Sequence, residues 1–180
     1  SSQTYSVIQA LSGNAVLPRR EFLGFVFFAF GYWLAVYFGL LFVAQPEGIA
    51  SIWFASGVAL AALLLYPKNQ RIKLFTIIFV INALGNWMDG SLLWISLCFA
   101  IANTLEAAFC VWTLEYFCGS KIAFGRAMEI ITLLGAVIFC NGLTALLGAA
   151  VSFFAFDVSL ISAWLVWWTA DGLGIILVAP

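Results

Sequence analysis

The sequence contains no histidine, and only 8% of its 180 residues are charged. Without histidine, the chain cannot supply a histidine ligand to haem or zinc, a phosphohistidine relay or a Ser-His-Asp triad. The four cysteines form no CxxC pattern and are most simply small apolar residues of helices. We therefore expect no metal, no cofactor and no catalytic residue in this chain.

The scarcity of charge also bears on the environment of the protein. A soluble domain carries about a quarter charged residues and just under half apolar ones. Here 65% of the residues are hydrophobic, so a water-facing surface cannot be built and the lipid bilayer must cover most of the protein. The net charge of −1 gives no general attraction to nucleic acid. The composition predicts an integral membrane protein that does not bind nucleic acid.

The two ends of the chain suggest a piece of a longer protein. The first 20 residues lack a starting methionine and are largely polar, without the basic and apolar regions of a signal peptide. The chain stops at Pro180, still inside an apolar stretch. We expect a cytoplasmic N-terminal segment over 1–21 and a membrane domain over 22–180, which further helices could follow in a larger bundle.

Apolar stretches predict the fold class. A helix needs about 20 apolar residues to cross roughly 30 Å of hydrocarbon. Helices are the only credible spanning elements here, because lipid cannot satisfy the backbone of an open strand. We therefore predict an all-α integral membrane protein, a bundle of six transmembrane helices. The predicted spans are 22–44, 49–66, 74–88, 91–118, 127–154 and 163–180.

Basic residues predict the orientation of the bundle. All seven Lys and Arg residues fall before the first span, after the second or after the fourth, which is one face of a six-span protein. The opposite loops carry Glu47, Asp89 and Asp157 and no positive charge. Cytoplasmic loops are enriched in Lys and Arg. The pattern predicts a cytoplasmic N-terminus and a cytoplasmic end to the sixth span.

Polar residues inside the spans form the candidate site. At about 1.5 Å per residue, counting from the predicted helix ends places several of them at one depth near mid-membrane. These residues are Asn82, Asn86, Asn103, Glu106, Asn141 and Asp171. A carboxylate that faces lipid is costly, so Glu106 and Asp171 should point into the bundle.

The spans contain no Lys or Arg that could pair with these two acids. Three alternatives remain: the carboxyl groups are protonated, the asparagine amides bond to them, or they neutralise a cation or cationic ligand. The layer then either locks the helix packing or recognises a ligand. Trp164, Trp167, Trp168 and Asp171 share one helix face, and aromatic rings beside a carboxylate can accept a cation. The candidate ligand-binding or signalling residues are Trp53, Asn82, Asn86, Asn103, Glu106, Asn141, Trp168 and Asp171.

Four stretches of the chain are similar, in the same order, to one family of proteins. They are "IASIWFASGVALAALLLY" (49–66), "NALGNW" (82–87), "ANTLEAAFCVWTLEY" (102–116) and "WLVWWTADGLGIILVAP" (164–180). In them the chain resembles the first type of bacterial membrane-associated sensor domain, abbreviated MASE. The most specific parts are Asn103-Thr-Leu-Glu106-Ala and the ending of tryptophan, acid, glycines and proline. One departure is Phe54-Ala55, where the family often has a proline after the tryptophan.

This resemblance implies a sensory input module that is itself not an enzyme. Family members are normally fused to a cytoplasmic output domain, such as a GGDEF diguanylate cyclase, an EAL phosphodiesterase or a histidine kinase. It therefore implies a role in cyclic-di-GMP or two-component signalling. We expect the stimulus to be an unknown small ligand or a membrane partner protein, and we consider a homodimer as the assembly. The resemblance does not identify the ligand.

Two other functions compete with the sensor. The size and the six spans also fit the substrate-binding membrane subunit of a small-molecule uptake transporter, for which a polar site at mid-membrane is typical. The spans lack helix-breaking prolines and a clear repeat, which argues against transport. An intramembrane enzyme has little support, because Glu106 and Asp171 are accompanied by no evident nucleophile or metal set.

Overall fold

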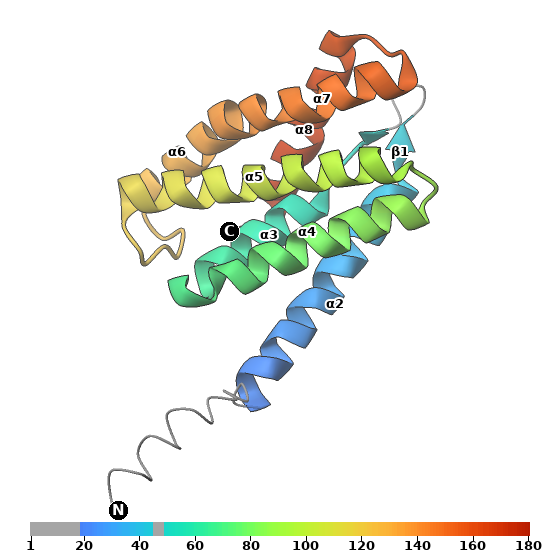
Figure 1. Ribbon diagram of the computed structural model, residues 1–180. Helices are drawn as coiled ribbons and strands as arrows, with labels where there is room; N and C mark the ends of the chain where they lie inside the picture. Colours follow the sequence, from blue (N-terminus) through green and yellow to red (C-terminus); the bar gives the residue numbers. More distant parts are fainter. Residues whose placement is uncertain (1–18, 45–48) are drawn as a thin grey trace, which may run out of the picture.

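The computed structural model describes residues 19–44 and 49–180 and forms a helical bundle (Figure 1). The predicted bundle of six helices is confirmed in this part of the chain. Two-residue strands, β1 (Val43–Ala44) and β2 (Ile49–Ala50), pair in antiparallel fashion, and a 3-10 turn, η1, covers Lys68–Gln70. The helices are α2 (Arg19–Leu41), α3 (Phe54–Leu65), α4 (Arg71–Met88), α5 (Leu93–Cys118), α6 (Ala127–Ala136), α7 (Gly142–Phe156) and α8 (Leu160–Val178). Helix α6 continues into α7 through the π-helical turn η2 (Val137–Asn141).

Five helical segments are long and apolar enough to cross a membrane: α2, η1 with α4, α5, the continuous α6–η2–α7 segment and α8. Helix α3 differs, because its 12 residues extend over only about 18 Å. The prediction of one continuous helix over 49–66 was therefore wrong in its first part. Residues 49–50 form β2, and the helix begins only at Phe54.

The late start of α3 has a cause in the surrounding structure. The Ser51 N–H donates to the carbonyl of Phe42 at 2.9 Å, and the Trp53 N–H donates to the carbonyl of Ala170 in α8 at 3.0 Å. These bonds satisfy backbone groups that would otherwise need a helix inside the membrane. Gly174 allows the close approach, because a Cβ atom at this position would collide with the carbonyl oxygen of Trp53.

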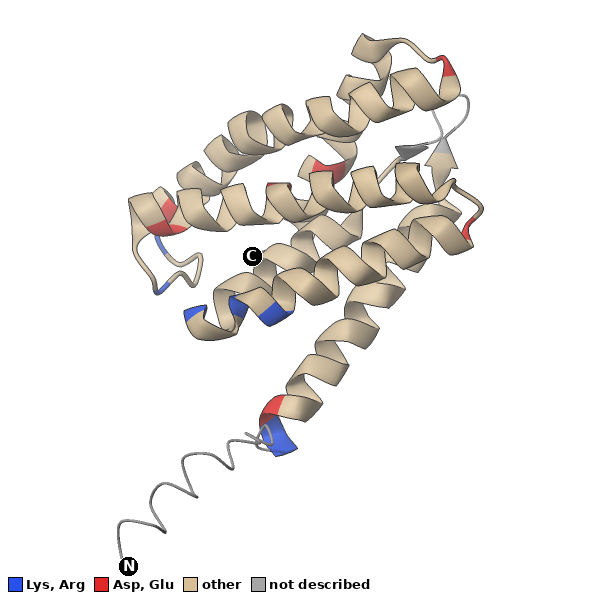
Figure 2. Cartoon of the chain, in the orientation of Figure 1, with Lys and Arg blue, Asp and Glu red and all other residues tan. Residues whose placement is uncertain are grey.

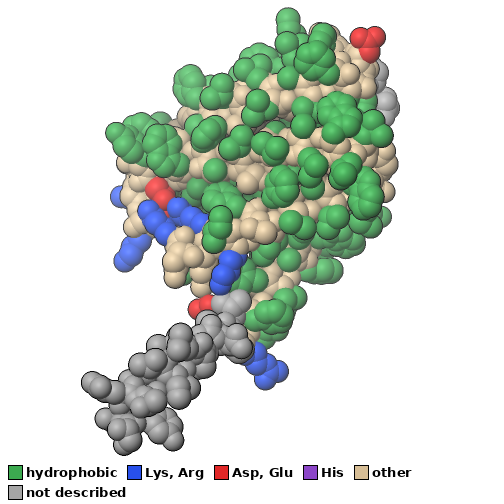
Figure 3. Space-filling model, in the orientation of Figure 1, with side chains coloured by type: hydrophobic (Ala, Val, Ile, Leu, Met, Phe, Trp, Pro, Cys, Tyr) green, Lys and Arg blue, Asp and Glu red, His purple; other side chains and the backbone are tan. Residues whose placement is uncertain are grey.

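The short helix α3 lies at the centre of the bundle and packs against α2, α5 and α8. Its side chains Ala55, Leu60 and Leu63 have no exposed surface. The longer helices around it present large apolar side chains outward. Examples are Phe27, Phe139 and Phe154, which are 75%, 76% and 79% exposed. Hydrophobic side chains cover most of the face in Figure 3, as expected for a surface that contacts lipid.

Charges separate the two ends of the bundle. All Lys and Arg side chains of the described residues lie at the end that carries the start of α2, the α3–α4 connection and the α5–α6 connection (Figure 2). We call this the basic end. Asp89 and Asp157 lie in the turns at the opposite end, and Glu47 lies outside the described residues. The C-terminus lies on the side of the α5–α6 connection (Figure 1), whereas most of the predicted N-terminal segment, 1–18, lies outside the described residues.

Candidate functional site

Glu106 of α5 and Asp171 of α8 form the core of the candidate site. Both side chains are buried, with 1% and 4% of their surface exposed, which confirms that they point into the bundle. The Ser56 hydroxyl of α3 donates to Glu106 Oε2 at 2.5 Å. The first turn of α3 relates the two acids, because Ser56 bonds to Glu106 and the Trp53 N–H donates to the carbonyl of Ala170, the neighbour of Asp171. Among the described residues, no hydrogen bond reaches the Asp171 carboxyl and no Lys or Arg pairs with either acid.

The asparagines bond to one another instead of to the acids. Asn103 Nδ2 and Asn86 Nδ2 both donate to Asn82 Oδ1, at 3.3 and 3.1 Å. Asn82 Nδ2 in turn donates to the Tyr32 hydroxyl at 3.4 Å. This buried network ties α2, α4 and α5 together. Within the described residues, the asparagine amides therefore do not compensate the two carboxyl groups, which removes one of the three alternatives raised by the sequence.

Asn141 and Trp168 form a second contact, between η2 and α8. Asn141 Nδ2 donates to the Trp168 carbonyl at 2.9 Å, and Trp168 Nε1 donates to the Val137 carbonyl at 2.9 Å. The Trp164 and Trp168 rings stack with centroids 5.2 Å apart, and Trp164 Nε1 bonds to the Gly142 carbonyl. The two indole N–H groups thus hold α8 against the π-helical turn and the first residue of α7. Such turns frequently occur at functional sites.

Trp53 connects the site to the start of α3. Its backbone bonds to Ala170, next to Asp171, and its ring packs over Gly39 of α2, where an added Cβ would lie 2.6 Å from a ring carbon. The ring is 7% exposed, and its Nε1 atom has no hydrogen-bond partner among the described residues. The N-terminus of α3 therefore begins beside the middle of α8. A helix N-terminus carries partial positive charge, so it lies here near two acids.

All predicted site residues are buried except Trp168, which is half-buried. Sequence reasoning missed Ser56 and Tyr32. Both are polar residues inside apolar spans, the same signal that identified the asparagines. Ser56 stands in a run of small residues, which is more typical of close helix packing.

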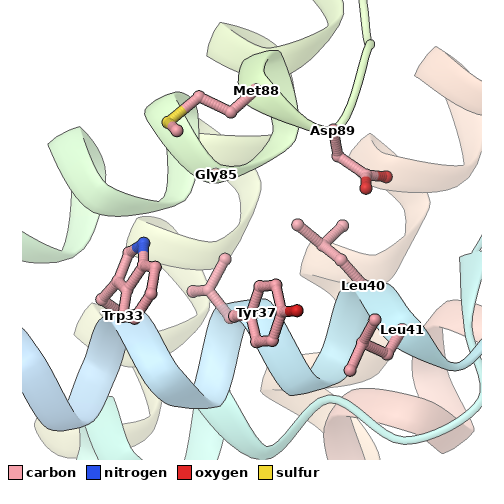
Figure 4. Close-up of a pocket in the computed structure, with 8 residues that line it drawn as sticks. Trp33, Tyr37, Leu40, Leu41, Gly85, Met88 and Asp89 are labelled. Atoms are coloured by element: carbon pink, nitrogen blue, oxygen red, sulfur yellow. The ribbon is translucent and has the colours of Figure 1, made fainter.

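Described residues also form pockets away from the two acids. The pocket in Figure 4 has a volume of about 210 Å³ between α2 and α4, near the end opposite the basic end. Its walls are Trp33, Tyr37, Leu40 and Met88 with neighbouring residues, and Asp89 lies at its rim. A second pocket of about 300 Å³ is almost entirely apolar and contains Trp168 and Gly172 in its wall. Two further pockets lie at the basic end and beside β1.

The described residues bring together no group of three or more His, Cys, Asp and Glu side chains that could hold a metal ion. Two buried acids with one serine donor can share a proton or balance one positive charge. Apolar helices around such a layer define a class of protein: a membrane-embedded helical domain with an ionisable centre. Such a centre is typical of membrane proteins that recognise or relay a signal, an ion or a substrate.

Comparison with known proteins identifies the family. The family model of MASE1, a membrane-associated sensor domain, matches residues 22–180, which is most of the chain. The chain therefore belongs to the MASE1 family, a family of membrane sensory domains in signalling proteins, as its motifs had indicated. No curated protein and no solved structure matches the chain.

Proposed function

We propose that this chain is the input domain of a bacterial signalling protein of the inner membrane. A change of occupancy or charge at Glu106 and Asp171 shifts the helix packing and thereby biases a cytoplasmic output domain, a GGDEF or EAL enzyme or a histidine kinase. The observation that carries this proposal is that the two acids are buried and have no basic partner in the described part of the chain, which belongs to a sensory family. Ligands shift such equilibria by binding two packing states unequally.

The basic end faces the cytoplasm in this proposal, because Lys and Arg are retained on the cytoplasmic side. In a cysteine-free background, Lys121→Cys and Asp157→Cys place single thiols in connections at opposite ends of the bundle. In cells with a permeabilised outer membrane and an intact inner membrane, a membrane-impermeant maleimide should label Asp157→Cys only. After lysis it should label both. Labelling of Lys121→Cys before lysis would contradict the orientation.

Helix α3 offers a mechanical link from the site to the basic end. Near its start, Ser56 bonds to Glu106. Near its end, the Leu63 carbonyl accepts a bond at 3.1 Å from Arg71, whose guanidinium also holds Glu115 at 2.7 and 2.9 Å. A change at Glu106 therefore acts on a helix whose other end is bonded at the basic end, where the output domain would begin.

The central test uses the full-length protein with its output domain. Glu106→Gln and Asp171→Asn remove each charge with little change of volume, and Asp157→Asn removes an exposed acid as a matched control. We expect both buried variants to insert at the wild-type level and to change basal output several-fold, whereas the control leaves output unchanged. Normal output from both inserted variants would show that these acids are not the sensory site.

One observation favours the second candidate, the substrate-binding subunit of an uptake transporter. Helix α3 begins beside the middle of α8 rather than at the membrane surface, and interrupted helices at mid-membrane are typical of transporters. The coding sequence around this chain separates the two functions. A cytoplasmic signalling domain in the same protein supports the sensor, and a solitary gene beside ATPase subunits supports transport.

A further inference from the structure

We propose that the carboxyl groups of Glu106 and Asp171 bind one small inorganic cation, a proton or an alkali-metal ion, at the centre of the bundle. This inference names the ligand of the site described above, so its signalling consequence rests on the proposed function. The binding itself does not, and it can be measured without any output domain activity.

The first argument is charge. Two carboxylates that interact in a medium of low dielectric constant repel each other strongly unless a positive charge lies nearby. Every ion pair of the described residues lies at the basic end, where Lys68 and Arg71 hold Glu115 and Arg126 holds Glu129. Among the described residues no side chain supplies a positive charge to Glu106 and Asp171, so a mobile cation must add to the partial charge at the N-terminus of α3.

The second argument is the chemistry of the unpaired atoms. Three buried oxygen atoms of the layer have no hydrogen-bond partner among the described residues: Glu106 Oε1, Asn103 Oδ1 and Asn141 Oδ1. An unpaired buried acceptor costs about 1–3 kcal/mol. Asn103 lies one helical turn from Glu106 on the buried face of α5. Asn141 Nδ2 would lie 3.2 Å from a Cβ atom added at Gly172, the neighbour of Asp171. The indole N–H groups of Trp53 and Trp167 are also buried without a partner among the described residues, but neither bonds to these oxygen atoms. The unpaired Glu106 oxygen therefore remains available to a cation or a donor.

The third argument is size. Neither Glu106 nor Asp171 lines any of the four pockets described above. The side chains around Glu106 are themselves buried: Ser56 of α3 bonds to it, and Asn103 and Cys110 lie one helical turn away on the buried face of α5. An ion of atomic size fits such packing better than an organic molecule does. Among the described residues, no Lys or Arg forms an ion pair with either acid.

The test is carbodiimide labelling of the full-length protein in lipid nanodiscs. Dicyclohexylcarbodiimide is an apolar reagent that modifies protonated carboxyl groups, and mass spectrometry of peptides locates the modified residue. Labelling of Glu106 is measured from pH 5 to pH 9 in sodium chloride, potassium chloride or N-methylglucamine chloride at equal ionic strength. The variants are Asp171→Asn and Ser56→Ala, with Asp89→Asn as an exposed control.

Each outcome decides the proposal. Protection of Glu106 by sodium or potassium, but not by N-methylglucamine, identifies an alkali-metal ion. Labelling that depends on pH alone, with a midpoint that shifts in Asp171→Asn, identifies a shared proton. In either case Asp171→Asn should shift the cation or proton concentration at which Glu106 labelling is half-maximal by roughly tenfold or more. Asp89→Asn should not shift it. The proposal is overturned if the labelling of Glu106 depends on neither pH nor the cation. It is also overturned if Asp171→Asn leaves the labelling unchanged. Binding with normal output in the charge variants would overturn only the sensory function.

Discussion

The contact between α3 and α8 allows a sharp test of the fold at its least regular point. Gly174 of α8 faces the backbone of Trp53 and Phe54, where α3 begins. The substitution Gly174→Ala adds one methyl group at this contact. The new Cβ atom would collide with the Trp53 carbonyl oxygen and would lie 2.6 Å from the carbonyl carbon and 3.2 Å from the Phe54 nitrogen. Backbone atoms cannot move aside as a flexible side chain can.

The expected loss of stability follows from these distances. Non-bonded carbon atoms pack at about 3.5–4.0 Å, so α3 and α8 must separate by roughly 1 Å. The hydrogen bond from Trp53 to Ala170, at 3.0 Å, is then stretched beyond useful length. Overpacking costs about 1–3 kcal/mol and the lost bond about 1 kcal/mol. We expect Gly174→Ala to lower the free energy of unfolding by about 2–4 kcal/mol.

The assay is unfolding of the purified protein in mixed micelles, followed by tryptophan fluorescence. The matched control is Gly31→Ala in α2, where an added Cβ atom meets no atom within 4 Å. We expect this control to be neutral or slightly stabilising, because alanine favours a helix over glycine by up to about 1 kcal/mol. Equal stability of Gly174→Ala and Gly31→Ala would refute the close contact of α3 with α8, and with it the interrupted second span.

Two further predictions concern the ends of the site. Arg71→Ala removes two bonds to Glu115 and one to the Leu63 carbonyl, so it should lower the free energy of unfolding by roughly 1–2 kcal/mol. The control Lys68→Ala changes a side chain that is 62% exposed and should cost under about 0.5 kcal/mol in the same unfolding assay. Equal effects would contradict the role of Arg71. Trp168→Phe keeps the ring but loses the 2.9 Å bond to the Val137 carbonyl, so amide hydrogen exchange in η2 should accelerate by roughly fivefold, as expected for a loss of about 1 kcal/mol. Unchanged exchange would show that this bond does not hold the turn.

Burial of the two acids is the property that the sequence predicted well. Each apolar stretch must span a layer of known thickness, so counting residues places a polar group along the membrane normal. Glu106 and Asp171 were expected inside the bundle because lipid excludes charge, and both are buried. The basic clusters likewise gather at one end, because each loop alternates between the two sides of the membrane.

Rotation and pairing could not be derived in the same way. Whether Asn103 reaches Asn82 or Glu106 depends on how α4 and α5 turn about their axes, and an almost uniformly apolar helix gives little indication of its rotation. The start of α3 was hidden for a related reason. Residues 49–53 are as apolar as a helix, and the bond that keeps Trp53 out of the helix comes from Ala170, far away in the sequence.

The interrupted span also explains why a small change at the layer can act at a distance. Helix α3 is connected to α5 at two levels: Ser56 bonds directly to Glu106, and Arg71 of α4 bridges the Leu63 carbonyl of α3 and Glu115 of α5. The two glutamates are nine residues apart on α5, which is about 13.5 Å along the helix. A continuous second helix would be held by its own backbone on both sides of Ser56. Because α3 begins only at Phe54, its first turn is held by the bond of Trp53 to Ala170, the bond of Ser56 to Glu106 and the packing of Gly57 against Gly174. Loss of the bond to Glu106 therefore removes one of the few contacts that fix this turn, while the contacts at the basic end remain.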